Sequence, residues 1–443
     1  MGSALLTDLY ELNMAASYLR RGMTAPATFS LFVRGLPEGW GFLVSCGLER
    51  CLEFLEGLRF TGEDLEYLAR EHGYPDDTLE AFAALRFTGE AWAIPEGRVA
   101  FPIEPILEVT APLPEAQLVE SYVLNQITYQ TAIASKAARC RIAAPDADLV
   151  DFSLRRVHGM EAGLAVARAT AIVGFTSTSN VEAARRLGLR ASGTMAHSYV
   201  EAFPSEAEAF RAFADDYPDR VVLLVDTYDT RRGVEKAIEV ARDLESRGHH
   251  LAGIRLDSGD LAALARDARR ALDAAGLRGV RILASGGLDE QVIASLTAAG
   301  APIDAYGVGT KIGVSADAPY LDSVYKLVSY DGRAVAKLSE GKATWPNAKQ
   351  VWRLPGMAGD LISLRDEGGP QGADPLLEQV MRDGRRIGDH DLESARRRFS
   401  EDLAALPPSL RSLEPEPHPV GRSQGLERSN EDLRARIASR ELA

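Results

Sequence analysis

Cysteine is scarce in this chain: Cys46, Cys51 and Cys140 are the three that occur among its 443 residues. Three thiols at these spacings form neither a disulfide framework nor a zinc site. Long apolar runs are lacking too, because none reaches the about 18 residues that a membrane span requires. The first residues also lack the basic region and apolar core of a secretory signal. We therefore expect a reduced, cytoplasmic protein with no membrane partner.

Positive charge is also in short supply, with 50 Lys and Arg against 64 Asp and Glu and a net charge of -14. Such a balance opposes general attraction to nucleic acid, so we expect no nucleic-acid partner. Any anionic substrate must be met by a local basic pocket. Apolar residues are plentiful, at 46% of the chain, which is enough for a large core and for two domains.

One pattern repeats seven times between Leu149 and Thr310: a short β-rich run, a polar or glycine-containing cluster, then a helical stretch. The runs are Leu149–Leu154, Thr170–Phe175, Leu189–Thr194, Val221–Val225, Leu251–Leu256, Val280–Ala284 and Ile303–Val308. This alternation predicts the α/β class, as an irregular β/α barrel. The ends of barrel strands lie on one face, so the polar clusters are expected to converge on one pocket.

The rest of the chain does not follow this alternation. Residues 1–147 mix helical patches with strand-like pieces and prolines, which indicates an α/β cap domain. Residues 148–324 form the predicted barrel. The segment 325–443 begins with a hairpin-like alternation around Asp331-Gly332, so we expect it to return to the cap and to end in a surface tail.

Taken together, the motifs at the predicted strand ends resemble those of the nicotinate phosphoribosyltransferase family. The matching pieces are Leu6–Tyr10, Phe152–Arg156, Thr178–Asn180, Gly193–Ser198, Val225–Thr230, Arg255–Asp260, Ala284–Glu290, Gly307–Thr310, Val324–Leu327 and Lys337–Lys342. The chain departs from the family at Ser285-Gly286-Gly287, where Ser-Asn-Asp or similar is common, and at Pro346-Asn347, where Pro-Gly is common.

The resemblance implies an enzyme of NAD salvage that makes nicotinate mononucleotide and pyrophosphate from nicotinate and phosphoribosyl pyrophosphate. It also implies coupling to ATP hydrolysis, Mg²⁺ as a cofactor, and a homodimer with shared active sites. The pyridine nitrogen already has its lone pair, so the chemistry requires positioning and electrostatics rather than a strong base.

Glycine-containing turns follow the last two predicted strands. We assign them to the 5-phosphate, because glycine lets backbone N–H groups approach a phosphate and late barrel loops often build such sites. The residues are Ser285, Gly286, Gly287, Gly307, Gly309 and Thr310. Either turn alone is also compatible with an ordinary tight turn.

Arg255 and Asp257 share one face of a strand end, because side chains two residues apart point the same way. Arg255 can clamp a phosphate oxygen and Asp257 can accept from ribose hydroxyls, although a structural ion pair is the alternative. One or two carboxylates after Val225 suffice for Mg²⁺; the resemblance implies Asp226 as the ligand, whereas Asp229 either assists it or caps the next helix.

His197 is a lone histidine after an apolar strand, a setting in which histidine is often structural. In the family that the chain resembles, the matching histidine is phosphorylated by ATP, so we expect a catalytic phosphohistidine here. Asp229 or Glu201 could orient its ring, and the sequence does not choose between them.

The acceptor is expected to meet Phe152, Arg155 and the hydroxyls of Thr178 and Ser179. By resemblance, Tyr10, with Asp8 in the same motif, covers the other face of the pyridine ring from a neighbouring subunit. Core packing is the alternative role for either aromatic. No acidic residue occurs from Thr176 to Asn180, which favours nicotinate over nicotinamide.

Two competing functions remain open at this point. A nicotinamide or quinolinate phosphoribosyltransferase would share the barrel, but the first should carry an acid near Ser179 and the second should be shorter with more cations. A catalytically dead barrel that senses nucleotides should have lost Arg255, Asp257 or His197, and all three are present.

Overall fold

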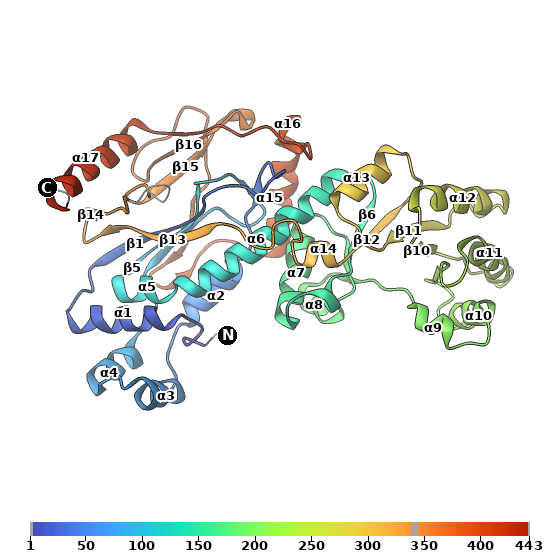
Figure 1. The fold of residues 1–443 in the computed structure, drawn as a ribbon, viewed down its shortest axis with the longest axis horizontal. Coiled ribbons are helices and arrows are strands. Elements are labelled where there is room, and N and C mark those ends of the chain that lie inside the picture. Colours follow the sequence, from blue (N-terminus) through green and yellow to red (C-terminus); the bar gives the residue numbers. More distant parts are fainter. Residues whose placement is uncertain (1–2, 339–343, 442–443) are drawn as a thin grey trace. The chain divides into compact units, whose positions relative to one another are not determined.

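The computed structural model describes residues 3–338 and 344–441 (Figure 1). The chain forms two compact units, one made of the residues up to Ser135 together with those from Tyr320 onwards, the other of Lys136–Pro319. The first boundary falls inside the long helix α6 (Glu120–Ala143). Residues 339–342 of the last resembling motif lie outside the described residues. We call the two parts the cap unit and the barrel unit.

The barrel unit contains a seven-stranded parallel sheet in the order β8-β7-β6-β12-β11-β10-β9. Its strands are β6 (Asp148–Asp151), β7 (Ser177–Thr178), β8 (Arg190–Ala191), β9 (Val222–Leu224), β10 (Gly253–Leu256), β11 (Arg281–Ser285) and β12 (Ala305–Val308). The first and last strands, β6 and β12, pair with each other, as in a barrel. The order ends at β8 and β9, so the sheet is a half-barrel open at one side.

Helices connect the strands of this sheet. They are α7 (Met160–Ile172), α8 (Val181–Leu187), α9 (His197–Glu201), α10 (Glu206–Asp216), α11 (Thr230–Ser246), α12 (Leu261–Ala274), α13 (Glu290–Ala298) and α14 (Thr310–Gly313), with the 3-10 turn η1 (Leu154–Arg156). Figure 1 shows α10, α11 and α12 side by side, and α11 and α12 both pack against β10. Side chains cap the N-termini of several of these helices. The side chain of Asn180 accepts from Ala183 N of α8 at 3.1 Å, and that of Asp260 accepts from Ala263 N of α12 at 3.0 Å.

Six of the seven predicted strand runs are confirmed, and the run Thr170–Phe175 is wrong. Residues up to Ile172 continue α7, and Gly174, with φ of +89°, then turns the chain towards β7. A short apolar run is compatible with either a buried strand or a buried helix end, so its periodicity could not decide.

The cap unit is built on an antiparallel sheet in the order β14-β13-β1-β5-β3-β18-β19. Its strands are β1 (Pro26–Val33), β3 (Glu90–Ala93), β5 (Pro105–Pro112), β13 (Ser323–Tyr330), β14 (Arg333–Ala334), β18 (Glu378–Arg382) and β19 (Arg385–Arg386). Strand β1 from the start of the chain pairs with β13 from the C-terminal part, which confirms a cap formed by both segments. The predicted hairpin around Asp331-Gly332 is β13-β14.

Two smaller sheets and several helices complete the cap unit. The sheets have the orders β17-β15-β16-β20 and β2-β4. Their strands are β2 (Leu43–Val44), β4 (Val99–Ala100), β15 (Lys349–Arg353), β16 (Asp360–Leu364), β17 (Asp374–Pro375) and β20 (Val420–Arg422). The helices are α1 (Leu9–Arg20), α2 (Leu48–Gly57), α3 (Gly62–His72), α4 (Asp76–Ala84), α5 (Leu113–Leu118), α15 (Leu392–Ala405), α16 (Pro408–Arg411) and α17 (Gln424–Glu441), with the 3-10 turn η2 (Pro355–Met357).

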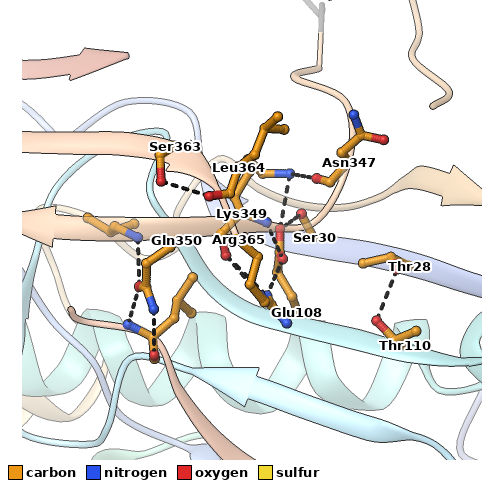
Figure 2. Close-up of polar contacts among 12 residues, drawn as sticks. Thr28, Ser30, Glu108, Thr110, Asn347, Lys349, Gln350, Ser363, Leu364 and Arg365 are labelled. Atoms are coloured by element: carbon orange, nitrogen blue, oxygen red, sulfur yellow. Dashed lines mark hydrogen bonds and ion pairs between the residues drawn. The ribbon is translucent and has the colours of Figure 1, made fainter. Parts of the chain in front are cut away.

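A buried ionic cluster joins the N-terminal and C-terminal strands of the cap unit (Figure 2). The carboxylate of Glu108, on β5, accepts from the backbone N–H of Lys349 at 2.9 Å and lies 3.0 Å from its Nζ. Ser30 and Arg365 also donate to Glu108. Burial lowers the pKa of Lys349, and the charge of Glu108 acts in the opposite direction. This single carboxylate therefore holds β1, β15 and the end of β16 to β5.

Candidate active site

Arg255 is the centre of a polar cluster at the C-terminal ends of the barrel strands. Its Nε donates to Ser285 Oγ at 2.7 Å, its Nη1 to Thr194 Oγ1 at 3.3 Å and its Nη2 to Asp257 Oδ1 at 2.5 Å. These partners come from the ends of three different strand regions. The strand ends therefore converge as the barrel pattern predicted, and the guanidinium is fixed in one orientation.

Asp257 remains a carboxylate at neutral pH. Burial alone would raise its pKa, but the hydroxyl of Ser285 and the charges of Arg255 and His197 hold the pKa of Asp257 below its ordinary value. The side chain keeps 28% of its surface exposed. It can therefore accept hydrogen bonds from hydroxyl groups of a bound molecule.

Asp226, just after β9, combines two roles. Its Oδ2 accepts from the backbone N–H of Asp257 at 3.0 Å and from Ser258 Oγ at 2.7 Å. Its Oδ1 is buried and has no hydrogen-bond partner. A buried carboxylate oxygen of this kind needs a partner, and a cation or a donor on the substrate would supply one.

These residues fit a magnesium ion held together with a substrate. Among the residues that the structure describes, no group of three or more His, Cys, Asp and Glu side chains is arranged to hold a metal ion. Mg²⁺ is commonly bound by one or two carboxylates plus substrate phosphates and waters, so the free oxygen of Asp226 is sufficient. Asp229 instead caps α11, accepting from Arg232 N at 2.9 Å.

His197 begins α9 and faces the same cluster. Its Nδ1 lies 3.2 Å from Thr227 Oγ1, and its Nε2 lies 4.0 Å from Asp257 Oδ2. The ring is therefore oriented by Thr227 rather than by the two acids considered from the sequence, Asp229 and Glu201. Thr227 was missed, although its place between Asp226 and Asp229 at a strand end was a signal. The side chain of His197 is 42% exposed, so the ring is accessible.

The glycines at the ends of β11 and β12 are required by close packing. A Cβ on Gly286, whose φ is +91°, would lie 1.9 Å from the carbonyl oxygen of Asp257. Gly287 also has positive φ, at +64°, but faces open space. Gly307 lies under the ring of Phe152, where a Cβ would meet Cε2 at 2.4 Å. Gly307 thus leaves room for the ring of Phe152, a role that the sequence did not predict.

Phe152 directly follows β6, and the guanidinium of Arg255 lies 5.4 Å from the centroid of its ring. Gly309, in the turn after β12, lies beside the Phe152 carbonyl oxygen, which a Cβ there would approach to 2.9 Å. Ser285 is buried, whereas Gly286, Gly287 and Thr310 are exposed at the strand ends. Arg155 is exposed within η1.

The two hydroxyls predicted to meet the acceptor differ. Thr178 is buried and donates to Asp151 Oδ2 at 2.7 Å. Ser179 is partly exposed and lines a cavity of about 780 Å³ together with residues at the starts of strands, such as Val222 and Arg281; Arg255 and Asp257 do not line it. Ser179 is therefore the accessible one of the pair.

Asp151 corrects one argument from the sequence. No acid occurs from Thr176 to Asn180, yet strand pairing brings Asp151 of β6 against Thr178. Burial raises the pKa of Asp151, while hydrogen bonds from Ser153 and Thr178 act in the opposite direction. Both its oxygens have protein partners, since Oδ1 accepts from Ser153 N at 2.9 Å. Both oxygens of Asp151 are therefore already hydrogen-bonded within the barrel unit. The sequence from Thr176 to Asn180 alone could not show that an acid lies beside Thr178.

Asp8 and Tyr10 lie in the cap unit, at the start of α1. Asp8 precedes the helix and its Oδ2 accepts from Ser121 Oγ at 2.5 Å. Tyr10 is 49% exposed, and partial burial together with the charges of Glu120 and Glu11 raises its pKa. The ring therefore stays neutral and available for contact at neutral pH.

Along residues 3–338 and 344–441, no helix has both the length and the apolar character that a membrane crossing needs. The family model described as the nicotinate phosphoribosyltransferase (NAPRTase) N-terminal domain matches residues 5–128. The model of the nicotinate phosphoribosyltransferase (NAPRTase) family matches residues 147–344.

Individual proteins match over most of their length. Nicotinate phosphoribosyltransferase pncB2 of Mycobacterium tuberculosis is 49% identical over 416 residues, which cover 93% of this chain and 89% of that protein. Nicotinate phosphoribosyltransferase of Bacillus subtilis is 46% identical over 377 residues, covering 82% and 76%.

Among solved structures, human nicotinic acid phosphoribosyltransferase matches with a TM-score of 0.87 at 29% identity, covering 96% of this chain and 99% of that one. Nicotinate-nucleotide pyrophosphorylase from Pyrococcus furiosus shares the fold, with a TM-score of 0.75 at 24% identity over 91% and 95% of the two chains.

Proposed function

The chain belongs to the nicotinate phosphoribosyltransferase family, and from that premise we propose how its residues carry out the reaction and couple it to ATP. The enzyme forms nicotinate mononucleotide for NAD by salvage of nicotinate. The bond between C1 of the ribose and the pyrophosphate oxygen breaks, and a bond from C1 to the pyridine nitrogen forms. The nitrogen supplies its lone pair, so no proton has to be removed.

The single observation that carries the assignment of the active site is the cluster around Arg255. Arg255 and Asp257 are fixed against each other by Ser285, with Asp226 bonded to the backbone of Asp257. In our proposal Asp257 accepts from the ribose hydroxyls and Arg255 binds a phosphate oxygen. Both are held in position before the substrate arrives, which is how positioning lowers a barrier.

Asp226 is the proposed Mg²⁺ ligand, through its buried and unpartnered Oδ1. When bound, Mg²⁺ neutralises charge on the pyrophosphate and makes it a better leaving group. Asp226 Oδ2 meanwhile keeps its hydrogen bonds from the backbone N–H of Asp257 and the hydroxyl of Ser258, so the proposed metal ligand is fixed next to the proposed ribose-binding residue.

The 5-phosphate is assigned to Ser285, Gly286, Gly287, Gly309 and Thr310, with Gly307 contributing by seating Phe152. Exposed backbone at Gly286 and Gly287 supports this assignment. Phe152 offers its ring to the pyridine, and Arg155 and Ser179 are available for the carboxylate of nicotinate. The adjacent Thr178 is held in place by its hydrogen bond to Asp151.

ATP coupling is assigned to His197. The phosphoryl group would pass from ATP to the ring, releasing ADP, and later to water, releasing phosphate. A phosphoryl group adds close to two negative charges beside Asp257 and Asp226, so it changes the affinity for a Mg²⁺-bound substrate or product. The exposed ring fixed by Thr227 supports this role.

We also propose a cytoplasmic homodimer in which Tyr10 and Asp8 of one subunit complete the acceptor site of the other. The exposed apolar side chains Leu6, Leu9 and Tyr10 at the start of the cap unit support a contact there. Cys46, Cys51 and Cys140 are buried and form no disulfide, which suits a reducing compartment.

A turnover assay with nicotinate or nicotinamide, each with and without ATP, tests the proposed function. We expect product from nicotinate in every case and stimulation by ATP. Faster turnover of nicotinamide than of nicotinate would contradict the proposed acceptor.

Mixing of subunits tests the shared active site. Tyr10→Ala subunits mixed with Arg255→Ala subunits should restore part of the activity, because one hybrid site receives both intact residues. No recovery despite subunit exchange would point to sites within single chains.

A further inference from the structure

Glu11 is a fully buried carboxyl group without a basic partner among its hydrogen-bond contacts. It lies one residue after Tyr10 on α1, with 0% of its surface exposed. Its Oε2 contacts the hydroxyl of Thr7, and its Oε1 lies 3.0 Å from Ser121 Oγ on α6. Burying a carboxylate among hydroxyls alone is costly, so this group needs an explanation.

The same two hydroxyls also hold the segment that carries Asp8 and Tyr10. Thr7 Oγ1 lies 3.0 Å from the carbonyl oxygen of Leu118 at the end of α5. Ser121 Oγ lies 2.5 Å from Asp8 Oδ2 and accepts from the Asp8 backbone N–H at 3.2 Å. The start of α1 is therefore attached to α5 and α6 through Thr7, Ser121 and Glu11.

Counting protons shows which state of Glu11 fits this arrangement. Each hydroxyl carries one proton, but four oxygens face the pair: both oxygens of Glu11, Oδ2 of Asp8 and the carbonyl of Leu118. The hydroxyl of Tyr10 also bonds Glu11 and is a third donor, so with Glu11 ionised one of the four oxygens still has none. A proton on Glu11 lets it donate to Thr7, which then donates to Leu118, while Ser121 donates to Asp8.

The surrounding charges favour the same state. Glu120 on α6, Asp8 just before α1, Tyr10 on α1 and Tyr325 on β13 all interact electrostatically within this cluster, and Lys326 acts on Glu120. Burial first, and then the charge of Glu120, raise the pKa of Glu11 to about 7, although hydrogen bonds from Thr7, Ser121 and Tyr10 act in the opposite direction.

We infer that Glu11 is a positioning residue: in its protonated form it fixes the Asp8–Tyr10 segment to α5 and α6, and its ionisation loosens that segment. The acceptor role of Tyr10 belongs to the proposed function, so the effect on nicotinate rests on it. Affinity for nicotinate should then fall as the pH rises through 7, while affinity for phosphoribosyl pyrophosphate, assigned to the barrel unit, should not change.

The Michaelis constants of the full-length enzyme for both substrates, measured from pH 6.5 to 8, test this inference. If only the protonated form is competent, the KM for nicotinate of the wild type should rise about tenfold over this range. Glu11→Gln, which keeps a donor at all pH values, should hold the KM low throughout. The matched control is Glu115→Gln, which removes another carboxyl of raised pKa, one that bonds Thr88 instead. It should behave as the wild type.

Hydrogen exchange separates the inference from the proposed function. Protection of the amides of residues 7–12, corrected for intrinsic exchange rates, should fall with pH in the wild type and stay constant in Glu11→Gln. Protection that is independent of pH in the wild type, or a KM for nicotinate that rises equally in Glu11→Gln, would overturn the role of Glu11. A normal KM for nicotinate in Tyr10→Ala would instead remove Tyr10 from the acceptor site, whatever the exchange shows.

Discussion

The Nδ1 of His197 lies 3.2 Å from the Oγ1 of Thr227, so the ring is held from the end of strand β9. The phosphoryl transfer that we propose for His197 would benefit from such a fixed ring, because its orientation is set before ATP binds. This contact leads to two predictions, one for substitution of His197 and one for substitution of Thr227.

With γ-labelled ATP, the wild type should acquire an acid-labile, base-stable label that His197→Ala lacks. His197→Ala should still form nicotinate mononucleotide slowly, but without stimulation by ATP. Thr227→Val should label several-fold more slowly, whereas Thr227→Ser keeps the hydroxyl and should label normally. Equal ATP stimulation in the wild type and His197→Ala would return His197 to a structural role.

Asp257→Asn should lower kcat/KM for phosphoribosyl pyrophosphate by roughly ten- to a hundredfold. The reason is the loss of a charge-assisted hydrogen bond to the ribose, about 1.5 to 3 kcal/mol. Steady-state kinetics check this, and an unchanged circular dichroism spectrum confirms the fold. The control is Asp260→Asn, which alters a helix cap at the end of the same strand. Near-normal kcat/KM in folded Asp257→Asn would exclude it from the site.

Gly286→Ala tests the packing at the phosphate turn. Its Cβ would lie 1.9 Å from the Asp257 carbonyl oxygen, so the end of β10 must shift and the Arg255–Asp257 pair with it. We expect kcat/KM to fall by more than about tenfold, as misplacement of catalytic groups often causes. Gly300→Ala, at a glycine outside the site that also has positive φ (+60°) and open space, should cost only about 1 kcal/mol of stability with little effect on kcat/KM. Similar kinetics for the two variants would argue against the steric explanation.

Glu108→Ala should destabilise the cap unit by about 3 to 5 kcal/mol, because it leaves the buried Lys349 and Arg365 without their counter-charge. Urea unfolding followed by tryptophan fluorescence would measure this. Glu182→Ala, which removes an exposed ion pair with Arg185, should unfold at nearly the wild-type midpoint. Equal midpoints for both variants would show that the Glu108 cluster contributes little.

Six of the seven strand runs were predictable because a short apolar run is followed by polar or glycine residues, as Leu251–Leu256 is followed by Asp257-Ser258-Gly259-Asp260. The position of Arg255, Asp257 and Asp226 in one cluster followed from the parallel pattern. Thr227 and Asp151 could not be assigned in the same way, because their roles depend on which strands are neighbours and on register: Asp151 meets Thr178 only because β6 pairs with β7. The role of Gly307 likewise depends on the rotamer of Phe152, which no local pattern encodes.

Contacts within the barrel unit bring Arg255, Asp257, Asp226 and His197 together as a group, whereas Arg155 and Thr310 are exposed, and their roles stay predictions from the sequence. The misassigned run Thr170–Phe175 shows the limit of periodicity in short apolar segments. There, the alanine-rich stretch before Ile172 continues a helix until Gly174 ends it.

The opening of the half-barrel between β8 and β9 has a consequence for how the protein behaves in a crowded solution. A sheet that does not close exposes two edges, and exposed edges can recruit strands from other molecules. Here those edges are only two residues long in β8 and three in β9. Edges this short provide too few backbone donors and acceptors to template a foreign strand. The barrel unit can therefore leave its interior accessible from the side without offering a site for aggregation.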